Sequence, residues 1–234
     1  MRVGKTCMAR KGNKCFTRDV SVVKKSSVLA APAPSGGRPE TRAGLLDAME
    51  SLLGRKGFAG CTSTAVATEA GLSAGTFYGY FADRNAALAA LFAERLDAIM
   101  TEVEQSLTAD RLLDEGLRGA LSAAVAATIA GYGRHAAVLR AALAAVQTDA
   151  QIRDVYWDRH RRSADLVERF LRRAAAAGLV RSDSHAALAQ TVLLLLQALN
   201  SPVVLAGPNQ RVVAGIRRNV VDALEAVLAP RTST

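Results

Sequence analysis

Apolar residues recur at helical spacing along most of this chain, from residue 39 to residue 228. No run within that stretch alternates apolar and polar residues for long enough to predict a β-strand. The pattern therefore predicts an all-α fold. With 234 residues, 50% of them hydrophobic, the chain is long enough to bury a sizeable core in one large domain or two smaller ones.

The N-terminal segment, residues 1–38, carries most of the net charge of +9. It contains nine Lys and Arg residues and a single acid, Asp19. It shows no sustained helical or strand period and ends in a stretch rich in Ala, Pro and Gly, so we expect a disordered basic arm. Lys24 and Lys25 interrupt its apolar stretches, which argues against a secretion signal.

The cysteines and the apolar segments favour a protein of the reducing cytosol. Cys7, Cys15 and Cys61 are too few and too poorly spaced for a disulfide framework or a zinc site. The most apolar segment, residues 186–199, contains two glutamines and is shorter than the roughly 20 residues that span a membrane. We therefore expect a cytoplasmic protein without a membrane-spanning helix.

The expected helices divide the fold into two domains, over residues 39–100 and 101–230. In the first domain, one helix ends at Gly57, a residue suited to the left-handed conformation that follows a helix. A longer helix starts after the N-cap Asp83, runs to about Val103 and links the domains. The Ala- and Leu-rich helices expected beyond it cover roughly residues 112–130, 135–147, 150–177, 184–199 and 209–228.

Residues 62–81 have the pattern of two short helices that cross tightly. Thr62 or Thr64 can cap the first helix, and Ser73 can cap the second. Gly71 suits the turn between them, because a side chain there would obstruct it. The pattern predicts a helix-turn-helix.

The second of these helices has one face for the core and one for DNA. Phe77 and Phe81 are four residues apart, so both point to the core. Residues at the start of the helix can reach base edges in the major groove, and residues at its end can hydrogen-bond phosphates. The DNA-binding candidates are Ala74, Gly75 and Thr76 for bases, Tyr78, Tyr80 and Arg84 for phosphates, and Thr62 and Thr64 on the first helix.

These residues stand in an order that resembles the TetR family of bacterial regulators. In that family a first helix ends in Gly-aromatic and is followed by Ala-x-x-Ala-Gly-Val-Ser-x-Gly-Thr-aromatic-Tyr-x-x-Phe. The resemblance covers about residues 39–100. The matching residues are Gly57, Phe58, Ala67, Ala70, Gly71, Leu72, Ser73, Gly75, Thr76, Phe77, Tyr78, Phe81, Arg84 and Leu88.

The resemblance implies a transcriptional regulator that binds a palindromic double-stranded DNA operator as a homodimer, as a repressor released by a small-molecule ligand. It implies no enzyme activity and no cofactor. Regulators that activate, depend on a protein partner or have lost DNA affinity are the alternatives. The last is motivated by Ala74 and Gly79, which stand where the family commonly has polar or aromatic residues.

The charge of the small domain suits DNA poorly. Residues 39–104 contain five basic residues against nine acids. The basic arm can compensate, because 38 flexible residues span roughly 35 Å, similar to the ~34 Å of one DNA turn. An arm without a part in DNA binding is the alternative.

Two other motifs suggest different chemistry. Residues 71–75 spell the Gly-x-Ser-x-Gly of serine hydrolases, but the nucleophile of that motif follows a strand and here a helix is expected. His135, His160 and His185 have no spacing suited to a metal site. We therefore expect neither an enzyme nor a metal centre.

Seven arginines crowd the helix expected over residues 150–177, and acids lie four residues before three of them. These pairs are Asp158 with Arg162, Asp165 with Arg169 and Glu168 with Arg172. Such spacing is typical of a solvated helix face rather than a second DNA-binding patch.

The last two helices are more apolar than one exposed surface requires. In the resembled family they pair with their symmetry mates in a four-helix bundle, so we expect the homodimer contact there, with burial inside a single chain as the alternative. The apolar residues are Leu188, Val192, Leu195, Leu196, Leu199, Ile216, Val220, Leu224 and Val227.

The resemblance also implies a ligand pocket among the middle helices, whose occupation tilts the DNA-binding domains apart. Candidate residues place aromatic or polar tips among apolar ones, and ordinary core or surface placement is the alternative for each. They are Tyr132, Leu143, Tyr156, Trp157, His160 and Gln190. With only 5% aromatic residues in the chain, a small apolar pocket is favoured over a broad stacking one.

Overall fold

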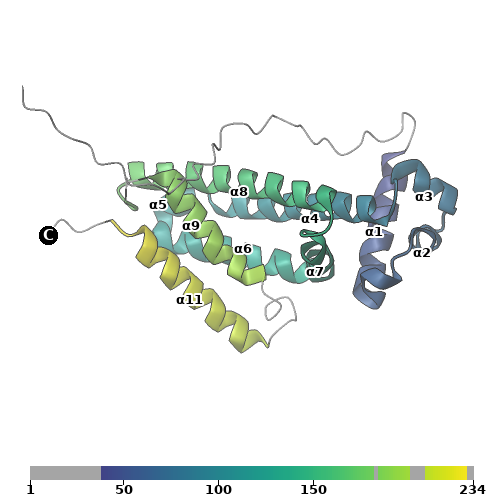
Figure 1. Cartoon of the computed structure of the whole chain (residues 1–234). Helices are drawn as coiled ribbons and strands as arrows, with labels where there is room; N and C mark the ends of the chain where they lie inside the picture. Colours follow the sequence, from purple (N-terminus) through teal and green to yellow (C-terminus); the bar gives the residue numbers. More distant parts are fainter. Residues whose placement is uncertain (1–37, 182–183, 201–208, 231–234) are drawn as a thin grey trace, which may run out of the picture.

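The computed structural model describes residues 38–181, 184–200 and 209–230, and these residues form helices without any strand (Figure 1). The predicted all-α class is confirmed. A small N-terminal group comprises α1 (Pro39–Lys56), η1 (Phe58–Gly60), α2 (Ser63–Glu69) and α3 (Ala74–Tyr80). An elongated group comprises α4 (Arg84–Ser106), α5 (Ala109–Asp114), α6 (Gly116–Arg134), α7 (Ala136–Ala145), α8 (Ala150–Ala176), α9 (His185–Gln197), η2 (Ala198–Asn200) and α11 (Gln210–Leu228).

One expectation concerns a segment that lies almost wholly outside the described residues. The arm expected over residues 1–38 lies outside the described residues except for Arg38, which precedes α1. Among the described helices, none is long and apolar enough to cross a membrane.

Side chains in the sequence set the starts of the first helices. Thr62, Ser73 and Asp83 each accept a hydrogen bond from the backbone amide three residues further on, over 3.1, 3.1 and 2.8 Å. Each bond satisfies an amide left unpaired at a helix N-terminus. Gly57 and Gly71 adopt φ angles of 64° and 69° after α1 and α2, where a side chain would be strained. The predicted caps are confirmed, with Thr62 rather than Thr64 at α2.

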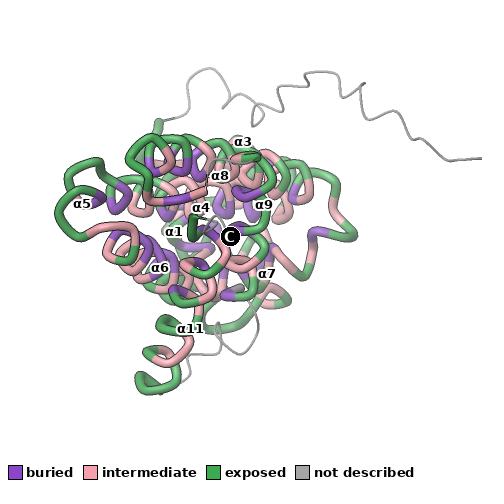
Figure 2. Tube along the Cα trace, turned by 90° about the vertical axis from the view of Figure 1, so that its left-hand side faces the viewer, coloured by how far each residue is buried: buried purple, intermediate pink, exposed green. Residues whose placement is uncertain are grey.

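The first hydrophobic core joins α1, α2, α3 and the first half of α4. Leu45, Met49, Phe77 and Phe92 are essentially closed to solvent in it, and Phe81 is also buried. In the end-on view of Figure 2, the buried positions lie mostly toward the interior of the helix bundle and the exposed positions toward its outside. The spacing of the two phenylalanines on α3 therefore predicted their direction correctly.

This first core extends beyond the small group of helices. Val138 and Leu139 of α7 and Ile152 of α8 belong to it, and α7 packs directly against α1. The boundary expected at residues 100 and 101 falls inside α4, which runs unbroken from Arg84 to Ser106. Consequently α4 is a structural part of both groups.

The second core joins α6, α8, α9 and α11. It encloses Leu188, Val192, Leu199 and Leu224, four of the residues expected at a homodimer contact. Burial inside a single chain, the alternative, holds for these four. Leu195, Leu196, Ile216, Val220 and Val227 are partly buried against the same core.

The single helix predicted over residues 112–130 is wrong. The chain forms a short α5, capped by Thr108, and then starts α6 at Gly116. Gly116 has a φ of 68°, which reverses the local backbone between the two helices. Periodicity alone did not show this break, because apolar residues continue on both sides of it.

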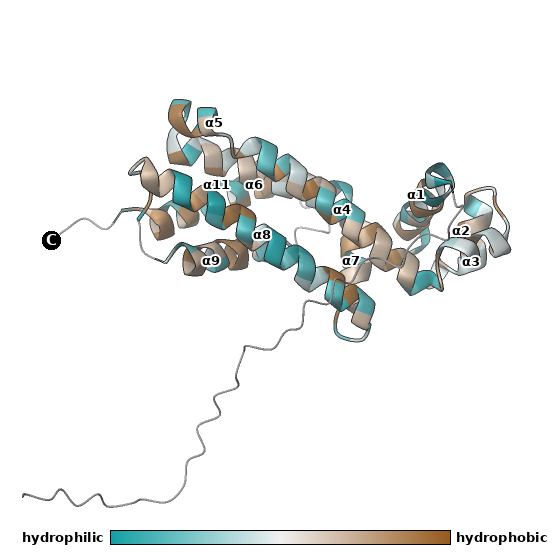
Figure 3. Ribbon diagram, turned by 90° about the horizontal axis from the view of Figure 1, so that it is seen from above, coloured by the Kyte–Doolittle hydropathy of each residue, from teal (hydrophilic) through white to brown (hydrophobic). Residues whose placement is uncertain are grey.

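The outer face of α8 is hydrophilic, as its charge pattern predicted (Figure 3). Arg162 pairs with Asp158 over 3.1 Å and Arg172 pairs with Glu168. Arg169 instead reaches Glu104 of α4, at 3.6 Å. The face is therefore solvated but also holds α8 against α4.

Candidate nucleic-acid interface and ligand cavity

A tight turn joins α2 to α3 at one end of the molecule (Figure 1). The backbone amide of Leu72 donates to the carbonyl of Ala67 over 2.8 Å, and that of Gly71 donates to Thr68 over 3.0 Å. Ala67 is fully buried, which permits the close approach of the two helices. The turn therefore holds α3 with Phe77 inward and its opposite face outward.

The residues expected to contact bases lie on or beside this outward face. Gly75 is exposed, and Ala74 and Thr76 are half-buried. The hydroxyl oxygen of Thr76 lies 2.9 Å from that of Ser73, which also caps α3. The contact with Ser73 thus restricts the orientation of the Thr76 hydroxyl on the surface of α3.

Three further candidates are open to solvent. Thr62 and Thr64 are exposed at the start of α2. Tyr78 is 57% exposed and its ring packs edge-on against Phe77, so the ring is anchored while its hydroxyl points away from the core. A phenol placed this way can donate to a phosphate oxygen.

Tyr80 and Arg84, also expected at phosphates, make contacts within the protein. The Tyr80 hydroxyl donates to the backbone carbonyl of Arg38 over 3.3 Å. The Arg84 guanidinium lies over the Phe58 ring, 4.6 Å from its centroid, and 3.5 Å from the Phe58 carbonyl oxygen. Both side chains therefore stabilise the small domain, in contacts that helix periodicity does not predict.

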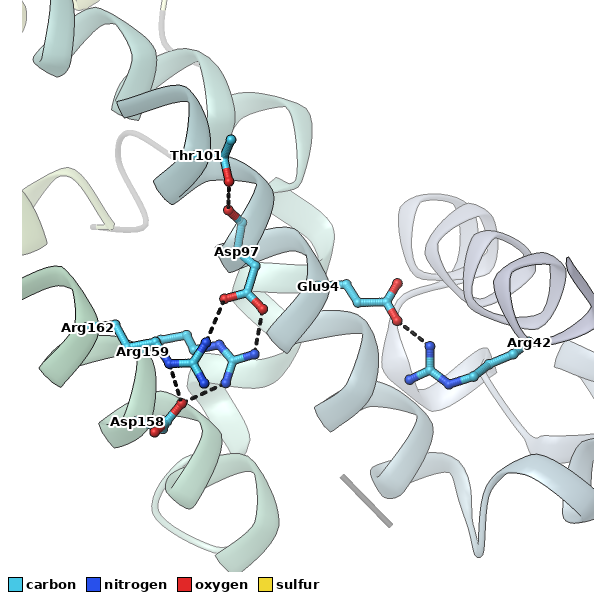
Figure 4. Close-up of polar contacts among 7 residues, drawn as sticks. All are labelled: Arg42, Glu94, Asp97, Thr101, Asp158, Arg159 and Arg162. Atoms are coloured by element: carbon cyan, nitrogen blue, oxygen red, sulfur yellow. Dashed lines mark hydrogen bonds and ion pairs between the residues drawn. The ribbon is translucent and has the colours of Figure 1, made fainter. Parts of the chain in front are cut away.

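Acids neutralise most of the basic side chains in this region. Arg42 pairs with Glu94 (Figure 4), and Arg95 lies 2.7 Å from carboxylates of both Asp47 and Glu50. A further pair joins Arg55 of α1 to Glu69 of α2, and the hydrogen bond from Arg55 lowers the pKa of the Glu69 carboxyl. Among the described residues around α3, most of the positive charge is consequently paired with carboxylates rather than free to contact DNA.

A cavity of about 110 Å³ lies among α4, α6, α7, α8 and α9, and we call it the central cavity. Its walls are mostly aliphatic. Leu96, Ile99, Met100 and Val103 come from α4, Leu139 and Leu143 from α7, Leu166 and Val167 from α8, and Leu193 and Leu196 from α9. Of the six ligand candidates, Tyr132, Leu143, Tyr156 and His160 line it.

The other two candidates lie beside the central cavity. Trp157 is 49% exposed, and its ring meets the His160 ring edge-on at 5.5 Å. Gln190 is exposed and its amide oxygen lies 3.0 Å from Nε2 of His160. Neither residue lines the cavity, and both are exposed to solvent instead.

Gln197, which sequence reasoning missed, organises the polar end of the cavity. Its amide nitrogen lies 3.2 Å from the Tyr156 hydroxyl and 3.0 Å from Nδ1 of His160. Since Nδ1 accepts from Gln197, Nε2 carries the proton that is donated to Gln190. Burial raises the pKa of the Tyr156 hydroxyl, which keeps it a neutral donor.

Arg159 is the second cavity residue that the sequence did not single out. Its terminal nitrogens pair with Asp97 of α4 over 2.6 Å and with Asp158 over 2.8 Å (Figure 4). Its Nε is buried and has no hydrogen-bond partner among the described residues. The charge pattern suggested only solvated arginines on this helix, because it does not show which of them faces inward.

Many solved structures are similar to this chain, including the following three. A protein from Mesorhizobium loti assigned to the TetR family of transcriptional regulators has 20% identity and a TM-score of 0.68, covering 81% of this chain and 97% of its own. FadR, a fatty acid degradation regulator from Bacillus halodurans, has 16% identity and a TM-score of 0.66, covering 81% and 96%. SmeT, the repressor of the Stenotrophomonas maltophilia multidrug efflux pump SmeDEF, has 21% identity and a TM-score of 0.58, covering 80% and 90%.

These likenesses show a shared fold. No curated protein sequence matches the chain. Residues 45–94, however, match the profile of the bacterial regulatory proteins of the tetR family. These residues form a TetR-type DNA-binding domain.

The matched TetR segment contains the whole helix-turn-helix, from the buried stripe of α1 to the middle of α4. The protein is therefore a DNA-binding transcriptional regulator of the helix-turn-helix type. Ser73, the central residue of the Gly-x-Ser-x-Gly run, follows α2 and caps α3 in this TetR domain. Within the described residues no group of His, Cys, Asp and Glu side chains is arranged to hold a metal ion.

Proposed function

We propose that this TetR-family regulator represses transcription by occupying a palindromic operator as a homodimer, and that a small molecule in the central cavity releases it. DNA contact is assigned to the outward face of α3 and to the start of α2, with Thr76 and Gly75 at base edges and Tyr78 at a phosphate. The role of Tyr80 and Arg84 at phosphates is retained as a secondary one.

The observation that carries this proposal is the position of α4. Its first half packs in the core of the DNA-binding helices. Its second half supplies four residues that line the central cavity. Arg42 of α1 pairs with Glu94, and Asp97, one turn further along α4, pairs with the cavity residue Arg159 (Figure 4). A ligand that changes the packing around the cavity therefore acts on α4, the helix that shares the first core with α3.

The homodimer is assigned to the parts of α9 and α11 that the chain leaves uncovered. Leu194 is 64% exposed and shares a face of α9 with Ala187 and Thr191. On α11, Val212 is also exposed. Leu194→Glu should shift the protein from dimer to monomer in sedimentation equilibrium, whereas the same change at the exposed Leu113 of α5 should not.

Selection of random duplexes by the full-length protein tests the DNA-binding proposal. Enrichment of a palindrome, bound by two chains, would support a specific dimeric regulator. A salt titration of that duplex should then give a shallower slope when the lysines of residues 1–38 are replaced by Gln, if the arm contacts phosphates. An unchanged slope would remove the arm from the interface.

A second reading is a regulator that has lost most of its own DNA affinity or needs a partner protein. Ala74 and Gly79 offer no polar side chain, and the nearby arginines are paired. No enrichment above non-specific binding in the same selection would favour this reading.

A further inference from the structure

We infer that the central cavity takes a small monocarboxylate, with an apolar body against the aliphatic walls and a carboxylate held by Arg159 and Tyr156. This inference rests on the proposed function, because it names the chemical class of the releasing ligand.

The size and lining of the cavity determine how large and how polar the main part of the ligand can be. The cavity, at about 110 Å³, is of the order of the ~150 Å³ that holds a benzene ring in an apolar core. Most of its wall consists of Leu, Ile, Val and Met side chains, which offer no polar group to the ligand. A short alkyl chain or a single ring therefore fits.

Two donors face the polar end of the cavity. The first is the N–H at Nε of Arg159, which is buried without a partner among the described residues. The second is the hydroxyl proton of Tyr156, since the oxygen of that hydroxyl accepts from Gln197. A buried donor without an acceptor is costly, and a ligand oxygen at this place would relieve that cost.

Charge balance favours an acid over a neutral ligand. Arg159 belongs to an ion-pair cluster that also contains Arg161, Arg162, Asp97 and Asp158. Three guanidinium groups face two carboxylates, so the cluster carries one positive charge in excess. Asp97 and Asp158 are not among the residues that line the cavity, so they leave its polar end without a carboxylate of its own. One ligand carboxylate neutralises the cluster and gains charge-assisted hydrogen bonds.

A comparison of hexanoate with hexanamide tests the effect of the ligand's charge, because the two compounds share an apolar chain and a carbonyl oxygen and only hexanoate is charged. Calorimetric titration of the full-length protein should show hexanoate binding about tenfold tighter or more than hexanamide. Trp157, the only tryptophan, touches the rings of both Tyr156 and His160, so its fluorescence should change during the titration. Equal affinity for the acid and the amide, or no binding of hexanoate at millimolar concentration, would overturn the inference.

Variants locate the site. Arg159→Gln should weaken hexanoate about tenfold or more and remove the preference over the amide, and Tyr156→Phe should weaken it less. Arg172→Gln is the matched control, because Arg172 is on the same helix but is 63% exposed, lies outside the cluster and does not line the cavity. Since Arg159→Gln leaves the Asp97 carboxylate only the 3.9 Å contact to Arg162, the double variant Arg159→Gln with Asp97→Asn tests the same loss in a less perturbed protein. Unchanged hexanoate binding in both would contradict the assignment.

The same preparations also separate this inference from the proposed function. If the protein selects an operator and another compound releases it while hexanoate fails to bind, only the carboxylate assignment falls. If hexanoate binds through Arg159 but no operator is selected or released, the carboxylate site stands and the repressor proposal falls.

Discussion

Nδ1 of His135 lies 2.7 Å from Oε1 of Glu50, which ties the start of α7 to the first helix of the DNA-binding domain. The second oxygen of Glu50 accepts from Nε of Arg95 on α4, also over 2.7 Å. All three side chains are mostly buried. One carboxylate thus joins α1, α4 and the start of α7. These contacts lie at the boundary between the DNA-binding helices and the elongated group, which share the first core.

Glu50→Gln should lower the free energy of unfolding by about 1–3 kcal/mol, because it removes the charge from two part-buried hydrogen bonds. Urea denaturation measures this change. Asp47→Asn is the control, since Asp47 pairs with the same Arg95 but is 70% exposed, and exposed pairs contribute about 0–1 kcal/mol. Equal effects of the two changes would show that Glu50 has no special role between the helices.

Gly79→Ala should stabilise the protein by about 1 kcal/mol, because glycine costs about that much inside a helix. Gly79 is exposed on α3 and a Cβ there would meet no atom within 4 Å. Gly71→Ala should destabilise it instead, since Gly71 has a φ of 69°. Thermal unfolding of both variants checks the two signs, and a destabilised Gly79→Ala would mean that α3 is strained at that position.

Arg84 and Phe58 should couple in a double-mutant cycle. With Arg84→Gln and Phe58→Leu, we expect a coupling of about 0.5–1 kcal/mol or slightly more in the free energy of unfolding, because the cation–π pair is part-buried. Strictly additive effects would leave Arg84 free to serve DNA alone.

Base and phosphate contacts on α3 should differ in how they affect DNA choice. Thr76→Val should change the preference among duplexes, because it removes the hydroxyl that we propose for contact with base edges, whereas Tyr78→Phe should weaken all duplexes about equally. Binding assays on the selected operator and on single-base variants of it measure both effects. The reverse pattern would exchange the roles of the two residues.

Cys61 should resist thiol reagents in the folded protein. Its side chain is buried and its Sγ donates to the Gly57 carbonyl over 3.3 Å, and burial raises the pKa of the thiol. The folded protein therefore holds this proton more tightly than the unfolded chain. The resulting stability is complete below the ordinary thiol pKa of about 8.5 and decreases as the pH rises above it. Iodoacetamide labelling with peptide mapping should modify Cys61 only in denaturant, and rapid native labelling would contradict its burial.

The sequence was most informative where neighbouring residues decide the structure. Ser73 and Asp83 cap helices because their partners are three residues away, and Phe77 and Phe81 share a face because of their spacing. It was less informative where distant segments meet. Arg84 lies over a ring 26 positions earlier, Gln197 reaches Tyr156 from 41 positions away, and Arg159 meets Asp97 across 62. Such pairs depend on how helices pack, and neither residue type nor period specifies that.

The length of α4 turns it into a lever arm. Its 23 residues extend about 34 Å at 1.5 Å per residue, from the cavity to the helix-turn-helix. A tilt of about 5° at the cavity end displaces the other end by about 3 Å, far more than the ~0.5 Å range over which a hydrogen bond keeps its length. In a dimer, two such arms swing in opposite directions, so the spacing of the two α3 helices changes by up to twice that amount. Under the proposed function, angular amplification of this kind is the means by which a molecule the size of a benzene ring would control contacts with a DNA turn that is several times longer.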